Sequence, residues 1–351
     1  KAPVVMEMLA EKCGREAFWE GVREYLKKYS YSNATWEDLI AVLDSKSSED
    51  LKSWSSPYIY EAGIPTIKQS IKGDLPVFDT LCYGYYKLPY VQAEKAMSYA
   101  MECEKQSDKG FILINVNENA LQGRIPTARY IDFLLEYLDK ERDPVLYSWA
   151  CSYLQRYHFL TKDITGGTLD KRVWKMLESN PDKECCRSAY SLLTTSCYTT
   201  ETTEKLLEIF DRPNRFTTFQ LSESQLTSLA YELAVRIPER ADSILMVARG
   251  RISNPDRIAQ FDFISPAVSP SEAVRDSVFE SLLLAENRAV EPWTVTSMRL
   301  LNHPLRSPQS EKYILPAIGI IEEIQATGDI FLPKNWASAL LSGHKGDTQH
   351  S

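Results

Sequence analysis

Histidine is scarce in this chain, and its scarcity limits the chemistry that the sequence can support. The 351 residues include only four histidines, which are His158, His303, His344 and His350. None of them belongs to an H-E-x-x-H pattern, in which two imidazoles bind zinc and a glutamate acts as base. The serine-hydrolase elbow G-x-S-x-G, the phosphate-binding G-x-x-x-x-G-K and the dinucleotide motif G-x-G-x-x-G are also missing. We therefore predict no catalytic residue in this chain, and we expect His344 and His350 to be solvated.

Paired cysteines are missing as well. The seven cysteines are scattered over the chain without a C-x-x-C pair, at Cys13, Cys82, Cys103, Cys151, Cys185, Cys186 and Cys197. Structural zinc sites usually hold cysteines two to four positions apart, and an odd, unpatterned set does not indicate a disulfide framework. We predict buried thiols, no metal ligand among them and no cofactor in this chain.

Long apolar runs and an excess of positive charge are the remaining absences. No segment reaches the ~18 consecutive apolar residues of a membrane span, and residues 1–7 contain no signal-peptide core. The 40 basic and 48 acidic side chains give a net charge of −8, so the field that attracts phosphate backbones is absent. We expect neither a nucleic-acid partner nor a membrane span; the compartment stays open between cytoplasm and periplasm.

Helical patterning is abundant. Apolar residues recur at helical spacing over residues 1–63, and Thr35 followed by Asp38 predicts a capping box at the start of a helix. The rhythm disappears over 64–88, where glycine and proline interrupt it. Beyond this segment, a polar residue followed by proline repeatedly predicts a helix start, with the polar residue as cap. These pairs are Asp143–Pro144, Asn180–Pro181, Asn254–Pro255, Ser269–Pro270 and Ser307–Pro308.

The spacing of these starts predicts an all-α fold. Successive starts often lie one helix and one short connection apart, so that two helices approach the ~40 residues of a HEAT-like repeat. The repeat has no fixed signature. An irregular α-superhelix of antiparallel hairpins therefore fits residues 89–351 better than a compact bundle does.

Several blocks of the sequence resemble a known family. They are Lys1–Leu9, Gly14–Phe18, Tyr25–Tyr29, Asn33–Leu39 and Trp54–Ile67, and later Cys82–Leu88, Ala285–Arg288 with Glu291–Trp293, and Thr327–Trp336. In this order they are similar to zinc aminopeptidases of the aminopeptidase N type, in bacterial members. The resemblance is strongest over residues 1–67 and implies that 1–63 are the last helices of a peptidase catalytic domain, with 89–351 as the C-terminal superhelical domain.

The resemblance also implies that parts of the family's enzymes are not contained in this sequence. The family removes N-terminal amino acids from peptides with a zinc ion held by H-E-x-x-H and a further glutamate. Those elements precede the position that matches Lys1, so we expect a fragment without the zinc site. It would need the missing N-terminal and catalytic domains as partners. Relatives with four domains carry a β-sandwich where only 64–88 remain here, which predicts a linker or a remnant of that domain.

Two arginines are candidates for contact with substrate. In the family the superhelix closes over a peptide cavity, and Arg275 and Arg299 would meet substrate carboxylates if they lie on its concave face. The alternative function is a non-enzymatic helical-repeat scaffold that binds a protein or peptide. Residues 1–67 favour the aminopeptidase fragment, because a pure scaffold has no reason to keep a block that resembles the helices behind a peptidase active site.

Overall fold

A computed structural model of the chain describes residues 2–67, 70–72, 75–77, 83–160 and 167–345, with no side chains described from 68 to 82. The chain forms two compact units, Lys1–Leu154 and Gln155–Ser351. Cys82 and His350, which the sequence analysis named, lie outside the described residues. The predicted division into 1–63, 64–88 and 89–351 stays a prediction.

The first unit begins with four helices around a small core. They are α1 (Ala2–Cys13), α2 (Arg15–Lys28), α3 (Trp36–Asp44) and α4 (Leu51–Ile59). Leu9, Phe18, Leu43 and Leu51 are buried together between them. Helices α2 and α3 come very close, since a Cβ on Gly21 would lie 2.5 Å from Leu43 Cδ2. A larger residue at this crossing would require the Leu43 side chain to shift.

The predicted capping box at the start of α3 is confirmed. The Thr35 hydroxyl accepts a hydrogen bond from Asp38 N at 3.3 Å, and Asp38 Oδ2 accepts one from Thr35 N at 2.9 Å. Aspartate replaces the usual glutamate here and still reaches back to the cap. Two backbone N–H groups that a helix start leaves without partners are thus satisfied.

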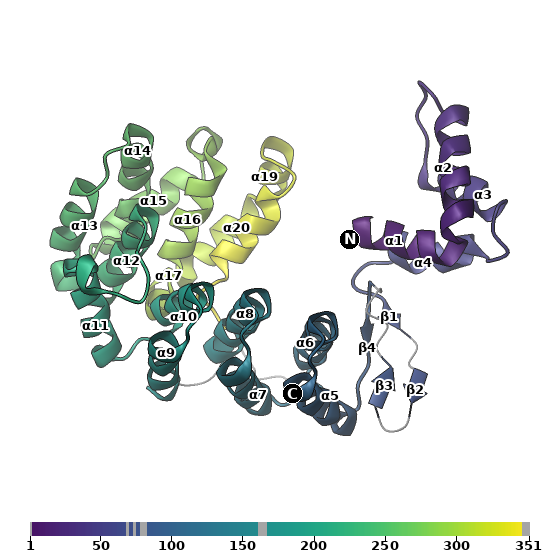
Figure 1. Cartoon of the computed structure of the whole chain (residues 1–351). Helices are drawn as coiled ribbons and strands as arrows, with labels where there is room; N and C mark the ends of the chain where they lie inside the picture. The colour runs from purple at the N-terminus through teal and green to yellow at the C-terminus, as the bar shows by residue number, and fades with distance from the viewer. Residues whose placement is uncertain (1, 68–69, 73–74, 78–82, 161–166, 346–351) are drawn as a thin grey trace. The chain divides into compact units, whose positions relative to one another are not determined.

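Short strands follow, and Figure 1 shows them beside the first helices. They are β1 (Thr66–Ile67), β2 (Ser70–Lys72), β3 (Leu75–Val77) and β4 (Tyr85–Tyr86). Strand β1 pairs with β4 in parallel, and β2 pairs with β3 antiparallel. Each strand is two or three residues long. Two such pairs leave the fold all-α in class, as the sequence predicted.

The next helices are α5 (Tyr90–Glu102), α6 (Gln106–Leu121), α7 (Thr127–Lys140) and α8 (Pro144–Leu160), and buried asparagines of α6 contact the β4 segment. On α6, Asn115 Oδ1 accepts from Tyr86 N at 2.8 Å, and Asn119 Oδ1 accepts from Leu88 N at 2.9 Å. Asn119 Nδ2 also donates to Tyr86 O at 2.8 Å. These side chains satisfy backbone groups of Tyr86 and Leu88 in addition to the pairing of β4 with β1.

The second unit continues with helices and single 3₁₀ turns. Their bounds are α9 (Thr168–Ser179), α10 (Lys183–Ser196), α11 (Thr200–Asp211), η1 (Pro213–Arg215), α12 (Glu223–Arg236), η2 (Pro238–Arg240), α13 (Ala241–Gly250), α14 (Pro255–Ile264), η3 (Ser265–Val268), α15 (Glu272–Leu282), η4 (Ala285–Arg288), α16 (Glu291–Leu301), η5 (Pro304–Arg306), α17 (Ser307–Ser310), η6 (Glu311–Tyr313), α18 (Ile314–Gly319), α19 (Ile321–Thr327) and α20 (Leu332–Leu340). Helix α9 packs on α10, α12 on α13 and α16 on α20 (Figure 1).

Only some of the predicted helix starts hold. Asp143 and Asn254 cap α8 and α14 as expected, since each carboxylate or amide oxygen accepts two backbone N–H groups of the first turn. Asn180 instead follows the end of α9, and Asp182 caps α10. Ser269 lies before the cap of α15, and Ser307 is already inside α17.

Within the described residues, no helix combines the length and the apolar character that a membrane crossing would need. The HEAT-like superhelix remains a prediction.

Candidate functional site

The second unit contains a cavity of about 420 Å³. Helices α10, α12, α14 and α16 and Ile252, in the loop before α14, supply its lining residues. A volume in this range suits a small molecule or a few residues of a peptide. We regard this cavity as the candidate functional site.

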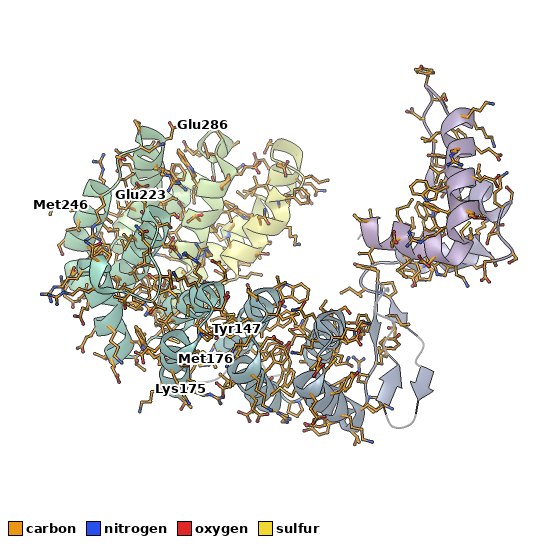
Figure 2. The ribbon with its side chains drawn as sticks, in the orientation of Figure 1. Tyr147, Lys175, Met176, Glu223, Met246 and Glu286 are labelled. Carbon is orange, nitrogen blue, oxygen red and sulfur yellow. The ribbon has the colours of Figure 1, made fainter. Side chains whose placement is uncertain are left out.

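The charged lining of the cavity consists of Arg187, Glu223, Glu232, Arg257 and Arg299. Arg257 Nη1 donates to Glu223 Oε1 at 3.3 Å, and Glu223 lies at the start of α12 (Figure 2). Arg187 Nε donates to Glu184 at 3.1 Å. Within the described residues, Arg299 is exposed and its guanidinium has no hydrogen bond or ion pair.

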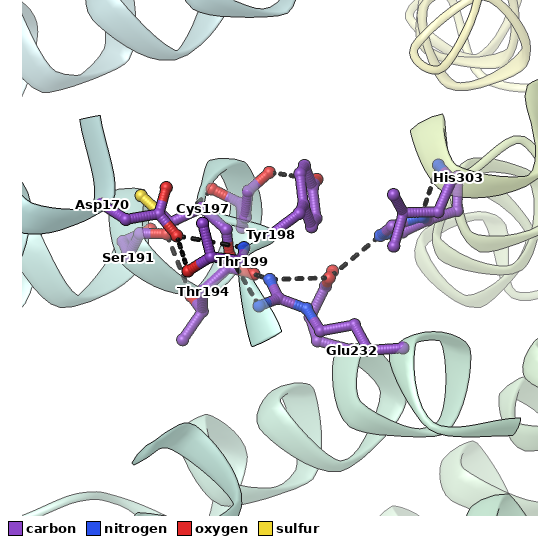
Figure 3. A network of polar contacts seen from close by, with 11 residues as sticks. Asp170, Ser191, Thr194, Cys197, Tyr198, Thr199, Glu232 and His303 are labelled. Carbon is purple, nitrogen blue, oxygen red and sulfur yellow. Dashed lines mark hydrogen bonds and ion pairs between the residues drawn. The ribbon is translucent and has the colours of Figure 1, made fainter. Parts of the chain in front are cut away.

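Glu232 is a buried carboxylate in this lining, and it has basic partners. Its Oε2 lies 3.0 Å from His303 Nε2 and 3.8 Å from Arg236 Nη2, and Figure 3 shows the contact with His303. Because His303 Nδ1 accepts from Leu305 N at 3.1 Å, Nε2 must carry the proton that points to Glu232. Burial acts to raise the pKa of Glu232, but His303, Arg236 and Arg299 outweigh it and lower that pKa.

Arg236 ties this carboxylate to the neighbouring loop. Its guanidinium donates to Cys197 O at 2.8 Å and to Thr194 O, at the end of α10. It also lies over the Tyr198 ring, 4.7 Å from the ring centroid. The Glu232 network therefore holds α10, α12 and the His303 segment together. Because α10 and α12 both line the cavity, the network helps to fix the shape of its wall.

Two tyrosines in the lining carry buried hydroxyl groups. Tyr190 is 4% exposed and Tyr231 is 6% exposed. Among the described residues, neither hydroxyl has a hydrogen-bond partner. The Tyr231 ring stacks on Phe261 at 5.4 Å between centroids. Buried polar groups are nearly always satisfied in folded proteins, so these two hydroxyls are exceptions, and their oxygens have almost no accessible surface for a ligand in the cavity to contact.

The two arginines named from the sequence occupy different surroundings. Arg299 lines the cavity. Arg275 is 4% exposed, and its guanidinium donates to Ser269 O at 2.7 Å, to Pro270 O at 3.0 Å and to Gln309 Oε1 at 2.9 Å. Both arginines belong to the second unit, but this cavity is lined by Arg299 and not by Arg275. Their contact with substrate stays a prediction.

Glu232, His303, Tyr190 and Tyr231 were not identified from the sequence as site residues. One signal was available for Glu232, which is a charged residue inside the apolar run Leu229–Val235. A carboxylate at such a position must be buried and paired. No comparable signal marks His303, because its partner lies 71 residues away in the sequence.

The side chains present do not fit a zinc site. Throughout the described part of the chain, no group of three histidine, cysteine, aspartate or glutamate side chains is placed to hold a metal ion. Both ring nitrogens of His303 are already in hydrogen bonds. His344, expected to be solvated, is half-buried instead, and its Nε2 contacts Asn302 Oδ1 at 2.9 Å and Ser310 Oγ at 3.3 Å.

Comparison with known proteins shows similarity to aminopeptidases. No protein-family model matches the chain. Aminopeptidase N of Streptomyces lividans is 35% identical over 74 residues, which are 21% of this chain and 9% of that protein. Aminopeptidase M1-C of Oryza sativa subsp. japonica is 40% identical over 73 residues, 21% of this chain and 8% of that protein.

A longer match has lower identity. Aminopeptidase M1-A of the same rice is 28% identical over 143 residues, 34% of this chain and 16% of that protein. The matches thus span less than a fifth of the length of these curated relatives. Over part of its length this chain is similar to aminopeptidases of the N and M1 types, and the similarity supports that family for it.

Proposed function

We propose that this chain is the C-terminal part of a zinc aminopeptidase that removes N-terminal amino acids from peptides. The observation that carries the proposal is the identity of 35–40% to aminopeptidases of the N and M1 types over 73 or 74 residues. The parent enzyme would bind zinc and peptide substrates. The described residues of this chain do not fit a zinc site, so we assign no step of the reaction to them.

The proposed division of labour follows the sequence resemblance. Residues 1–63 would be the last helices of the catalytic domain, 64–88 a linker or a remnant of a β-sandwich, and 89–351 the helical wall of the peptide cavity. The single buried cluster shared by α1 to α4 supports a structural unit at the N-terminal end. The short strands β1 to β4 all fall within the proposed linker.

Arg299 is the residue that we propose to face substrate. It is exposed in a cavity of the second unit and has no acidic partner at hydrogen-bond distance among the described residues. Arg275 is proposed with less support, because its guanidinium is buried and donates to two carbonyls and an amide oxygen.

A helical-repeat scaffold without catalytic activity is the second candidate function. The all-α fold and the cavity in the second unit favour it, because a purely helical unit can bind a ligand without any catalytic group. The two candidates differ in what accompanies this chain in the complete protein. The aminopeptidase proposal expects an H-E-x-x-H helix encoded upstream in the same reading frame, and the scaffold proposal does not.

The experiment has a genetic and a biochemical arm. In the first, the reading frame upstream of residue 1 is sequenced, and a frame without any H-E-x-x-H helix would contradict the aminopeptidase proposal. In the second, the purified chain is loaded with zinc, dialysed and analysed for metal, and then mixed with an aminoacyl anilide. We expect far less than one equivalent of zinc and no cleavage above background. Stoichiometric, tightly held zinc would show that the metal site was misassigned.

A further inference from the structure

Residues 341–345, which follow α20, lie directly against the chain between α16 and η6. A Cβ on Gly343 would lie 1.8 Å from Asn302 O and 2.9 Å from His303 C. Because these neighbours are backbone atoms and not a flexible side chain, a larger residue at this position would displace one of the two segments. We call residues 341–345 the strap and residues 302–310 the strapped segment.

His344 of the strap bridges the two ends of the strapped segment. Its Nε2 lies 2.9 Å from Asn302 Oδ1 and 3.3 Å from Ser310 Oγ. Asn302 Nδ2 donates to Met298 O at 2.9 Å, which leaves Oδ1 as the acceptor. The proton of the neutral imidazole is therefore on Nε2. Asn302 and Ser310 are almost fully buried, so the strap covers both ends of the segment.

The strapped segment supports the wall of the candidate cavity. It follows directly after α16, whose Arg299 and Leu300 line that cavity. It also contains His303, whose Nε2 lies 3.0 Å from Oε2 of the lining residue Glu232. Displacement of the strap would free both ends of the segment, and the contact that holds Glu232 would loosen with it.

Protonation of His344 would place a positive charge in this contact. The side chain is half-buried, and burial lowers its pKa, while the negative charge of Glu311 on η6 acts in the opposite direction. Among the described residues, no group accepts a hydrogen bond from Nδ1, the nitrogen that takes up the second proton. The closed strap therefore favours the neutral imidazole.

The neighbouring basic side chains have other partners. Arg306 Nη2, inside the strapped segment, donates to Val268 O at 3.1 Å. Lys345 Nζ lies over the Phe159 ring, 5.4 Å from its centroid, so the strap also contacts the end of α8. The last turn of α20, residues 337–340, contains no titratable side chain. His344 is thus the group of this contact whose charge changes near neutral pH.

We propose that the strap is a pH-sensitive device, which closes the second unit while His344 is neutral and is released, with the strapped segment, when His344 is protonated. In the closed strap the added proton has no acceptor from the described residues, whereas in the open strap water solvates the charge. Closing is therefore favoured above the ordinary histidine value of about pH 6.5, and this advantage is lost as the pH falls through the pKa of the closed strap. The proposal concerns the second unit alone and needs neither zinc nor substrate.

Imidazole NMR on the full chain measures the titration directly. The histidine signals are followed from about pH 8 to pH 5, and the signal that is missing in His344→Gln belongs to His344. We expect it to titrate below about 6.5. In Gly343→Ala it should return towards that value, because the added Cβ displaces the strap. Gly250→Ala is the matched control, since a Cβ there meets nothing within 4 Å.

Hydrogen exchange followed by mass spectrometry measures the opening. After correction for the intrinsic effect of pH, residues 302–310 and 341–345 should exchange at least roughly threefold faster at pH 5.5 than at pH 7.5. This dependence should disappear in His344→Gln and persist in His350→Gln, which removes a histidine outside the strap. In Gly343→Ala the exchange should be fast at both pH values. Circular dichroism of each variant verifies the fold.

Any of four results would overturn the proposal. They are titration of His344 at or above about 6.5 in the original chain, corrected exchange of residues 302–310 that does not depend on pH, the same pH dependence in His344→Gln, and unchanged exchange in Gly343→Ala. Because none of these measurements involves zinc or peptide cleavage, they can fail while the aminopeptidase proposal stands, and the reverse also holds.

Discussion

Glu232 illustrates how a single charged side chain can organise a helical wall. It is 7% exposed, and its hydrogen bond from His303 and its ion pair with Arg236 join segments that are far apart in the sequence. A buried ion pair adds little net stability when intact, since both charges lose their hydration. Removing one partner is costly, because the other remains buried with its charge.

The Glu232→Gln variant tests this role. We expect it to lower the free energy of unfolding by about 3 kcal/mol, because Arg236 stays buried without a negative partner. Urea titration followed by circular dichroism measures the change. Glu184→Gln serves as control; its pair with Arg187 is largely solvated, and we expect a loss below about 1 kcal/mol there. Equal losses in the two variants would contradict a special role of Glu232.

Glu141 is a second buried carboxylate, in the first unit. Its oxygens accept from Arg142 N and Asp143 N at 2.8 Å each, from Tyr137 Oη at 2.7 Å and from Lys109 Nζ at 3.1 Å. Burial acts to raise the pKa of Glu141, but these hydrogen bonds together lower it. A folded-state pKa below the unfolded value of about 4.3 stabilises the fold above that pH.

The lowered pKa of Glu141 predicts how the stability of a Glu141→Gln variant depends on pH. At pH 7 the variant should be less stable than the original chain by about 1–2 kcal/mol, since hydrogen bonds to a charged acceptor are weakened. The difference should shrink as the pH falls below about 4 and through the folded-state pKa, where Glu141 becomes neutral. Urea midpoints between pH 3 and pH 7 measure it. A difference that is constant over this range would show that the charge of Glu141 does not stabilise the fold.

At the scale of elements, side-chain caps and asparagines decide where helices start and how β4 is held. Thr35, Asp143 and Asn254 cap helices where a sequence pattern predicts it. Asn180 and Ser269 fit the same pattern but lie outside the first turn. A polar residue before proline favours a helix start locally, but the residue that caps the helix can lie one or two positions later, as Asp182 does for α10 and Ser271 for the position of the α15 cap.

Asn119→Leu tests the support of strand β4. The substitution leaves Leu88 N–H and Tyr86 C=O buried without their side-chain partner, so we expect a loss of about 2–4 kcal/mol in stability. Amide exchange at Leu88 should accelerate at the same time. Gln122→Leu, at an exposed position after the same helix, is the control. Unchanged exchange at Leu88 would mean that the backbone of β4 is held by other contacts.

At the scale of the whole molecule, each compact unit has its own buried core and is expected to open as a cooperative unit. Hydrogen exchange followed by mass spectrometry can test this. Glu232→Gln should accelerate exchange in α10, α12 and α16, and Asn119→Leu should do so in β4, α5 and α6. If either variant accelerated exchange evenly across residues of both units, the two units would have to unfold as one.

The resemblance to aminopeptidases comes from ordered blocks of the sequence. The sequence by itself also determined the all-α class and the Thr35 capping box. These depend on short-range spacing: apolar periodicity, and caps within three residues of their acceptors. The resemblance, and not the spacing, gives Arg275 and Arg299 as candidates for contact with substrate, and that contact stays a prediction.

Only the tertiary structure decided that Glu232 pairs with His303, that Arg275 is buried against backbone carbonyls, and that Arg299 lines a cavity. The contact between Glu232 and His303 joins residues 71 positions apart. Such a contact leaves no periodic trace in the sequence, because it arises when separate helices pack and the burial of each side chain is set by its neighbours in space.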